Sequence, residues 1–251
     1  MTSDTHDSPS LWRSLGEAAE AFGRWLEKNR DLTEGLSIWA SVAQECEQAH
    51  LYAPLQADSW RAIANLNRRD GDLSPTAAER LILDLYGPGG PGYSQLRSEL
   101  LEAPLLAEWL GPTTETLDAL DRAHSYLAIC GALPLVEWCL GKAAGKWQHP
   151  HKHDLGARLF DVPPASHADE AEMLLNWSAV DMLRRGVPEI WTGGSSFGVD
   201  TPLLRRNVVA HGLARGWDTP DNAIRAVLLV AAAARVAGPL LRPTEEAGAP
   251  S

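Results

Sequence analysis

Residues 219–239 read TPDNAIRAVLLVAAAARVAGP, and they carry the clearest fold signal in the chain. Thr219 before Pro220 predicts a helix start, with threonine as the N-cap and proline at the first helical position. Gly238-Pro239 predicts the end of that helix. Almost every other segment also has the 3.6-residue apolar spacing of a helix, whereas the alternation typical of strands is scarce. We therefore expect an all-α fold, a helical bundle.

Several upstream signals delimit further helices. Ser74-Pro75 repeats the start signal, and the glycine-proline run at residues 87–92 predicts a loop. That run has no lysine and no following GK[ST], which argues against a phosphate-binding loop. Thr113 or Thr114 is expected to cap a longer helix that continues to Cys130. The remaining predicted helices cover residues 11–26, 36–52, 60–66, 94–101, 104–110, 132–144 and 168–185.

Composition restricts the classes of partner. The chain has 251 residues and a formal net charge of −11, which argues against a broad electrostatic surface for duplex DNA or an anionic membrane. Any contact with nucleic acid is therefore expected in a local basic pocket. Arginine outnumbers lysine by 18 to 4, which suits bidentate phosphate or carboxylate contacts and is equally explained by a GC-rich genome.

The cysteines and the N-terminus give the expected compartment. Cys46, Cys130 and Cys139 are too few and too scattered for a disulfide framework or a zinc knuckle. The N-terminal residues MTSDTHDSPS lack the apolar region of a signal peptide. The apolar stretch at residues 226–234 is too short to span a bilayer. We expect a cytoplasmic protein that needs no cofactor.

A short basic motif is the best candidate for chemistry. Residues 206–211 read RNVVAH, so that Arg206 is followed at once by Asn207 and five positions later by His211, before Gly212. Thr201-Pro202 predicts a helix start just upstream, which would place Asn207 and His211 on one face. This spacing also arises by chance, and the structural alternative is a helix in which the arginine pairs with a carboxylate and the histidine packs.

The motif resembles that of the HEPN superfamily (higher eukaryotes and prokaryotes nucleotide-binding), whose active members carry Arg-polar-x3-His, and this resemblance implies RNA cleavage without a metal ion. Such cleavage needs a base for the 2′-hydroxyl proton, and histidine is the side chain whose unperturbed pKa lies nearest neutral pH. It also needs a fixed cation for the charge that develops on phosphorus, which an arginine supplies. His211 is thus the candidate base and Arg206 the candidate phosphate stabiliser, while Asn207 could orient the imidazole or hold a phosphate oxygen.

Three residues and the glycine after them carry the resemblance to the HEPN motif. Arg206, Asn207 and His211 match it, and Gly212 follows as in many members. The chain looks like an uncharacterised bacterial member, with residues 111–240 as a HEPN-like domain, residues 1–110 as a helical extension and residues 241–251 as a disordered tail. The resemblance implies a homodimer with two motifs at a shared cleft, RNA as substrate and a 2′,3′-cyclic phosphate product.

The resemblance also implies a biological setting and supporting residues. It points to a bacterial conflict system (toxin, abortive infection or phage defence) with a possible antitoxin or regulatory partner. Glu137 is the candidate for the acidic residue that often projects toward the motif, and pairing with a core arginine is an equal alternative. Arg205 is a candidate for phosphate or carboxylate binding, and Trp217 for stacking on a base. Most of the ten tryptophans are expected in the core.

Two other interpretations of the sequence stay open. The chain could be a non-catalytic helical interaction or nucleotide-binding module, because inactive members of this superfamily are common. His149, His151 and His153 would lie on one side of an extended segment and suggest a metal site. However, Pro150 and Lys152 interrupt them and no distant ligand completes a tetrahedron, so a solvated loop is the favoured interpretation and no metal is expected.

Overall fold

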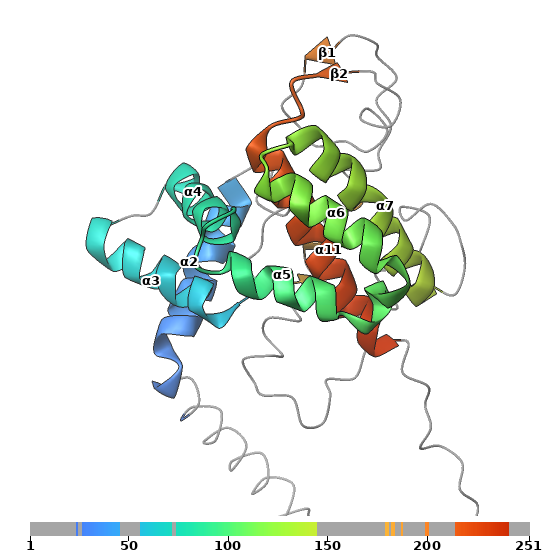
Figure 1. Cartoon of the computed structure of the whole chain (residues 1–251). Coiled ribbons are helices and arrows are strands. Elements are labelled where there is room, and N and C mark those ends of the chain that lie inside the picture. Colours follow the sequence, from blue (N-terminus) through green and yellow to red (C-terminus); the bar gives the residue numbers. More distant parts are fainter. Residues whose placement is uncertain are drawn as a thin grey trace, which may run out of the picture.

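The computed structural model describes residues 24, 27–45, 56–71, 74–144, 179–180, 182–183, 187, 199–200 and 214–240. Its helices are α2 (Arg30–Glu45), α3 (Ala57–Asp70), α4 (Pro75–Tyr86), α5 (Tyr93–Glu102), the 3-10 helix η2 (Pro104–Trp109), α6 (Leu110–Asp121), α7 (Ser125–Ala144) and α11 (Pro220–Leu240). The only described strands are β1 (Val199–Asp200) and β2 (Ala214–Arg215), of two residues each. The expected all-α fold is confirmed (Figure 1). None of the described helices is long and apolar enough to cross a bilayer.

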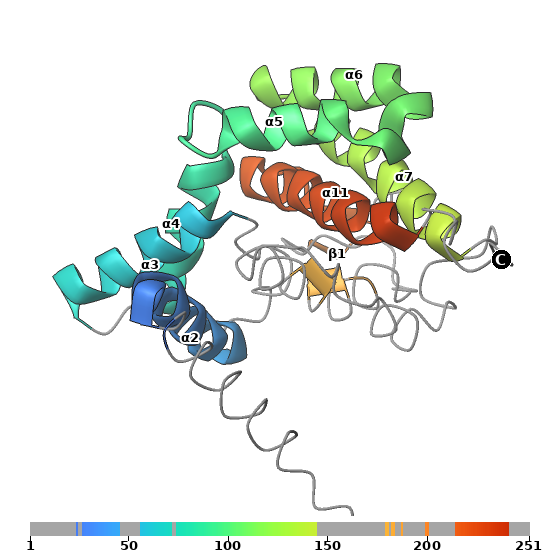
Figure 2. The same cartoon turned by 90° about the horizontal axis from the view of Figure 1, so that it is seen from below.

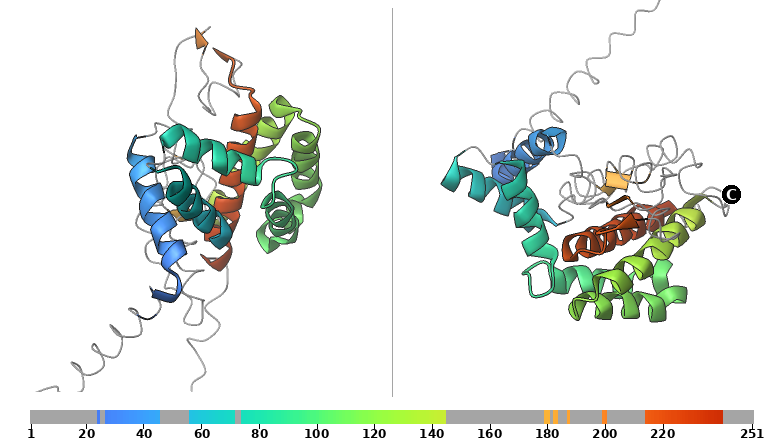
Figure 3. Two further views of the ribbon diagram at one scale, coloured as in Figure 1. Left: turned by 90° about the vertical axis from the view of Figure 1, so that its left-hand side faces the viewer. Right: turned by 90° about the horizontal axis from the view of Figure 1, so that it is seen from above.

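Helix α11 is the centre of the packing. Every residue from Asn222 to Ala234 is buried, so this helix is covered on all sides rather than along one stripe. Its main neighbour is α7, which also packs against α6, while α2 packs against α3. Figures 2 and 3 show α2 and α3 at one end of the molecule and α6 and α7 at the other, with α4 and α5 leading between them.

The helix starts predicted at Ser74-Pro75 and Thr219-Pro220 are confirmed, whereas Thr201-Pro202 lies outside the described residues. Ser74 accepts a hydrogen bond at Oγ from the amide of Ala77 (3.2 Å), and Pro75 occupies the first helical position of α4. Thr219 accepts a hydrogen bond at Oγ1 from the amide of Asn222 (3.2 Å) at the start of α11. These side chains satisfy amides that have no partner within the helix.

The expectation of one helix from Thr113 or Thr114 to Cys130 was wrong, because a turn separates α6 from α7. Ala123 has φ 58°, in the left-handed region, and its amide donates to the carbonyl of Leu120 (3.0 Å). The amide of His124 donates to the carbonyl of Ala119 (2.8 Å), which closes the turn. Glycine or asparagine usually marks such a turn, and neither occurs here.

The start of α6 also differs from the prediction. It begins at Leu110, so Thr113 and Thr114 lie inside the helix. Their hydroxyls donate to the carbonyls of Trp109 and Leu110, each at 2.8 Å. Bonding to a carbonyl four residues back is the other common use of a threonine hydroxyl, and it does not cap the helix start.

Side chains connect the two sides of the predicted boundary at residue 110. Trp138 of α7 donates from Nε1 to the carbonyl of Leu105 (3.0 Å). Arg97 of α5 pairs with Asp118 (2.8 Å) and Asp121 (3.0 Å) of α6. The buried apolar residues of both sides form one core cluster. The division into an N-terminal extension and a HEPN-like domain stays a prediction. The predicted tail at residues 241–251 lies outside the described residues.

Candidate functional site

The predicted motif lies outside the described residues, but both of its flanks are described. Arg205, Arg206, Asn207 and His211 belong to the connection of residues 201–213. This connection leaves β1 and enters β2, and the two strands pair in parallel with Asp200 opposite Arg215. The pairing brings the two ends of the motif-bearing connection side by side (Figure 1). Parallel neighbours require a connection of about a dozen residues or more, which this one provides.

A short link joins β2 to the buried helix α11. Gly216 has φ 81°, a backbone conformation that favours glycine. The carbonyl of Trp217 accepts a hydrogen bond from Nδ2 of Asn222 (2.8 Å), and Thr219 caps α11. The φ angle of Gly216, the hydrogen bond to the carbonyl of Trp217 and the cap at Thr219 therefore fix the path of the chain between the motif-bearing connection and α11.

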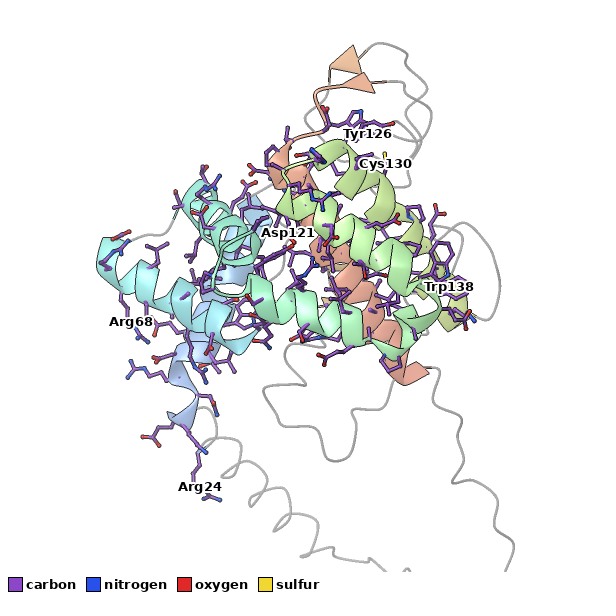
Figure 4. All side chains as sticks on the ribbon, in the orientation of Figure 1. Arg24, Arg68, Asp121, Tyr126, Cys130 and Trp138 are labelled. Atoms are coloured by element: carbon purple, nitrogen blue, oxygen red, sulfur yellow. The ribbon has the colours of Figure 1, made fainter. Side chains whose placement is uncertain are left out.

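Trp217 lies in the core at this point and exposes only 5% of its surface. Its ring packs against that of Tyr126 of α7, with centroids 5.4 Å apart and planes inclined by 38°. Tyr126 is 54% exposed (Figure 4). Stacking on a ligand needs an accessible ring face, so the ring available for stacking here is that of Tyr126, and Trp217 supports it from behind.

Tyr126, Cys130 and Glu137 follow one stripe of α7, because their spacings of four and seven residues return to about the same face. The pKa of Tyr126 is raised by the neighbouring charge and hydrogen bond of Cys130. Burial raises the pKa of the Cys130 thiol, so it is a poor nucleophile at neutral pH. Glu137 is half-buried, has an interaction partner, and lies roughly 16 Å along the helix axis from Tyr126.

A buried polar network follows at the start of α11. Arg225 is 7% exposed and Asn222 is 0% exposed. Arg225 donates from Nη1 to Oδ1 of Asn222 (2.7 Å) and pairs through Nη2 with the carboxylate of Glu79 on α4. Sequence patterns alone did not single out these residues. The available signal was a polar pair three positions apart, Asn222 and Arg225, near the start of a largely apolar helix.

The structure gives no support to a metal centre within its described ranges. No group of three or more histidine, cysteine, aspartate or glutamate side chains there could hold a metal ion. His149, His151 and His153 lie outside those ranges.

Comparisons of the chain with protein-family models, with curated proteins and with solved structures give no match. The function of the protein is therefore inferred from its own residues.

Proposed function

We propose that this protein is a metal-independent endoribonuclease of the HEPN type. His211 takes the proton from a 2′-hydroxyl, Arg206 stabilises the charge that develops on the phosphate, and Asn207 orients the imidazole or a phosphate oxygen. The products are a 2′,3′-cyclic phosphate and a 5′-hydroxyl. The protein acts in a bacterial conflict system in the cytoplasm and is held in check by an antitoxin or another regulatory partner.

The observation that carries this proposal is the motif itself, Arg206-Asn207 followed by His211-Gly212, in a chain whose described residues are mainly helical. Its flanking strands give further support, because they join it to a link that is packed into the core at Trp217. A catalytic set needs such a rigid support, since misplacement by about 1 Å can cost roughly a hundredfold in rate.

Substrate binding adds a second line of support. The exposed ring of Tyr126 lies next to the link that follows the motif, and base stacking is tolerant of sequence. With a net charge of −11, the chain repels RNA from most of its surface, so a local arginine cluster at Arg205 and Arg206 would dominate the electrostatic attraction.

The proposal includes a homodimer. One motif offers one histidine, whereas cleavage needs a base for the 2′-hydroxyl and an acid for the 5′-oxygen that leaves. A twofold axis next to the motif would bring His211 of a second copy to the leaving group. Equilibrium sedimentation should therefore give a dimer, and mixing His211→Ala subunits with wild-type subunits should lower the activity per wild-type subunit.

The test is to incubate the pure protein with a defined RNA in EDTA and to identify the new ends. A cyclic phosphate on the upstream fragment and a 5′-hydroxyl on the downstream one are expected.

Arg206→Gln should abolish the cleavage, and Arg205→Gln should reduce it less, because only Arg206 is followed directly by asparagine. RNA or nucleotide binding without cleavage would instead identify a non-catalytic interaction or nucleotide-binding module, and cleavage that requires a divalent ion would contradict the mechanism.

A further inference from the structure

Three side chains connect the N-terminal half of the chain to the link that follows β2. Glu79 of α4 pairs with Arg225 of α11, and Arg225 donates to Oδ1 of Asn222 (2.7 Å). Asn222 donates in turn from Nδ2 to the carbonyl of Trp217 (2.8 Å). Each contact begins where the previous one ends, so that a continuous polar path runs from α4 to Trp217.

The path lies in the interior, where such contacts have large effects. Arg225 is 7% exposed and Asn222 is 0% exposed. A buried guanidinium needs a counter-charge, and removing one partner of a buried pair is far more damaging than breaking a surface pair. The counter-charge here comes from a residue 146 positions upstream.

A second ion pair joins the same two helices without reaching the link. Arg80 of α4 lies 3.7 Å from Asp221 of α11, and both side chains are exposed (61% and 41%). Joining α4 to α11 therefore does not require the buried path. What the buried path adds is the hydrogen bond to Trp217, two residues after the end of β2.

We infer that Glu79, Arg225 and Asn222 form a clamp by which α4 fixes the link of residues 216–219 and, through it, strand β2. Arg225 and Asn222 are positioning residues that act on the backbone of Trp217. Any partner or modification that pulls Glu79 away from Arg225 would release β2 and loosen its pairing with β1. This inference does not rest on the proposed ribonuclease activity, because the contacts that carry it join α4, α11 and the backbone of Trp217.

Amide hydrogen exchange measured by mass spectrometry on the full chain tests the clamp. Glu79→Gln removes the counter-charge. Asn222→Asp keeps an acceptor for Arg225 and puts a carboxylate oxygen in the place of the Nδ2 donor, so the contact with the carbonyl of Trp217 is lost. Arg80→Gln is the matched control, because it removes the surface pair between the same helices.

The clamp predicts that residues 214–219 exchange on the order of tenfold faster in Glu79→Gln and Asn222→Asp, with little change in α2 and α3. Arg80→Gln should exchange like the wild type at residues 214–219. Unchanged exchange there in Asn222→Asp would overturn the inference, even if Glu79→Gln failed to fold. An equal increase in α2 and α3 would also overturn it, because the pair would then contribute only to global stability. Neither result depends on whether the protein cleaves RNA.

Discussion

The ring of Trp217 packs against the ring of Tyr126 at a centroid distance of 5.4 Å, and the buried tryptophan leaves the tyrosine half-exposed. A buried aromatic ring thus supports an accessible one beside the link that follows the motif-bearing connection. This relationship assigns the two rings different roles, one structural and one available to a ligand.

Tyr126→Ala should weaken RNA binding about tenfold with little change in kcat, because stacking on one base contributes roughly 1–3 kcal/mol. Tyr126→Phe keeps the ring and should bind like the wild type. Leu127→Ala is the control, since Leu127 is the adjacent residue and is 55% exposed. Fluorescence anisotropy with a labelled RNA measures the affinity. Equal affinity of Tyr126→Ala and wild type would remove Tyr126 from the binding site.

Gly131→Ala should destabilise the α6–α7 hairpin by about 1–3 kcal/mol, because an added methyl group would have to displace a neighbour. A Cβ at Gly131 would lie 2.2 Å from Oγ1 of Thr116, which is fixed by a hydrogen bond to the carbonyl of Pro112 (2.7 Å). Gly111 of α6 is the control, since a Cβ there meets nothing within 4 Å. Gly111→Ala should be neutral or stabilising by up to about 1 kcal/mol.

Urea unfolding of the glycine variants measures both effects. The double variant Gly131→Ala/Thr116→Ala should recover part of the lost stability, because it removes the hydroxyl oxygen that the new methyl group approaches. Additive losses in the double variant would show that the contact with Oγ1 of Thr116 is not the cause.

Burial raises the pKa of the Cys139 thiol to about 12. The folded state therefore keeps this proton while the unfolded chain loses it above about pH 9, so the free energy of unfolding falls as pH rises through this window, by up to about 1.4 kcal/mol per pH unit. Cys139→Ala should remove that part of the slope. Cys130→Ala is the control, because Cys130 is only half-buried and should contribute less. Identical slopes for wild type and Cys139→Ala between about pH 9 and pH 11 would disprove the assignment.

Thr219→Ala should cost about 1 kcal/mol of unfolding free energy, because it removes the acceptor for the amide of Asn222 at the start of α11. Thr114→Ala removes a hydroxyl that bonds within α6, so it should be neutral or slightly stabilising through the better helix propensity of alanine. Thermal unfolding of the two variants compares them directly. A loss at Thr114 as large as that at Thr219 would contradict the different roles of the two hydroxyls.

Local signals in the sequence predicted two helix starts correctly. Ser74-Pro75 and Thr219-Pro220 each place a side-chain acceptor and a fixed φ angle at the same end of a helix, and both capping hydrogen bonds are present. The turn at Ala123 was missed because the left-handed conformation falls on an alanine, which carries no local signal for it. The packing of α6 on α7 holds Ala123 in the left-handed conformation, although alanine does not favour it.

The buried clamp could not be predicted, because Glu79 and Arg225 are 146 positions apart and only the packing of α4 on α11 brings them together. The predicted stacking role of Trp217 depended on whether its ring is exposed to solvent. Residue type alone does not determine that exposure, and the ring is buried. The motif of Arg206, Asn207 and His211 was found from spacing and residue chemistry alone, and its geometry stays a prediction.

The most direct test of the ribonuclease proposal compares the rate of RNA cleavage in EDTA for wild type, His211→Ala and His124→Ala. His124 is an exposed histidine in the turn between α6 and α7, so its replacement controls for the loss of a histidine as such. General base catalysis contributes roughly 100- to 10,000-fold, so His211→Ala should fall by at least about 100-fold while remaining folded, and His124→Ala should match the wild type. Cleavage by His211→Ala at the wild-type rate would contradict the proposal.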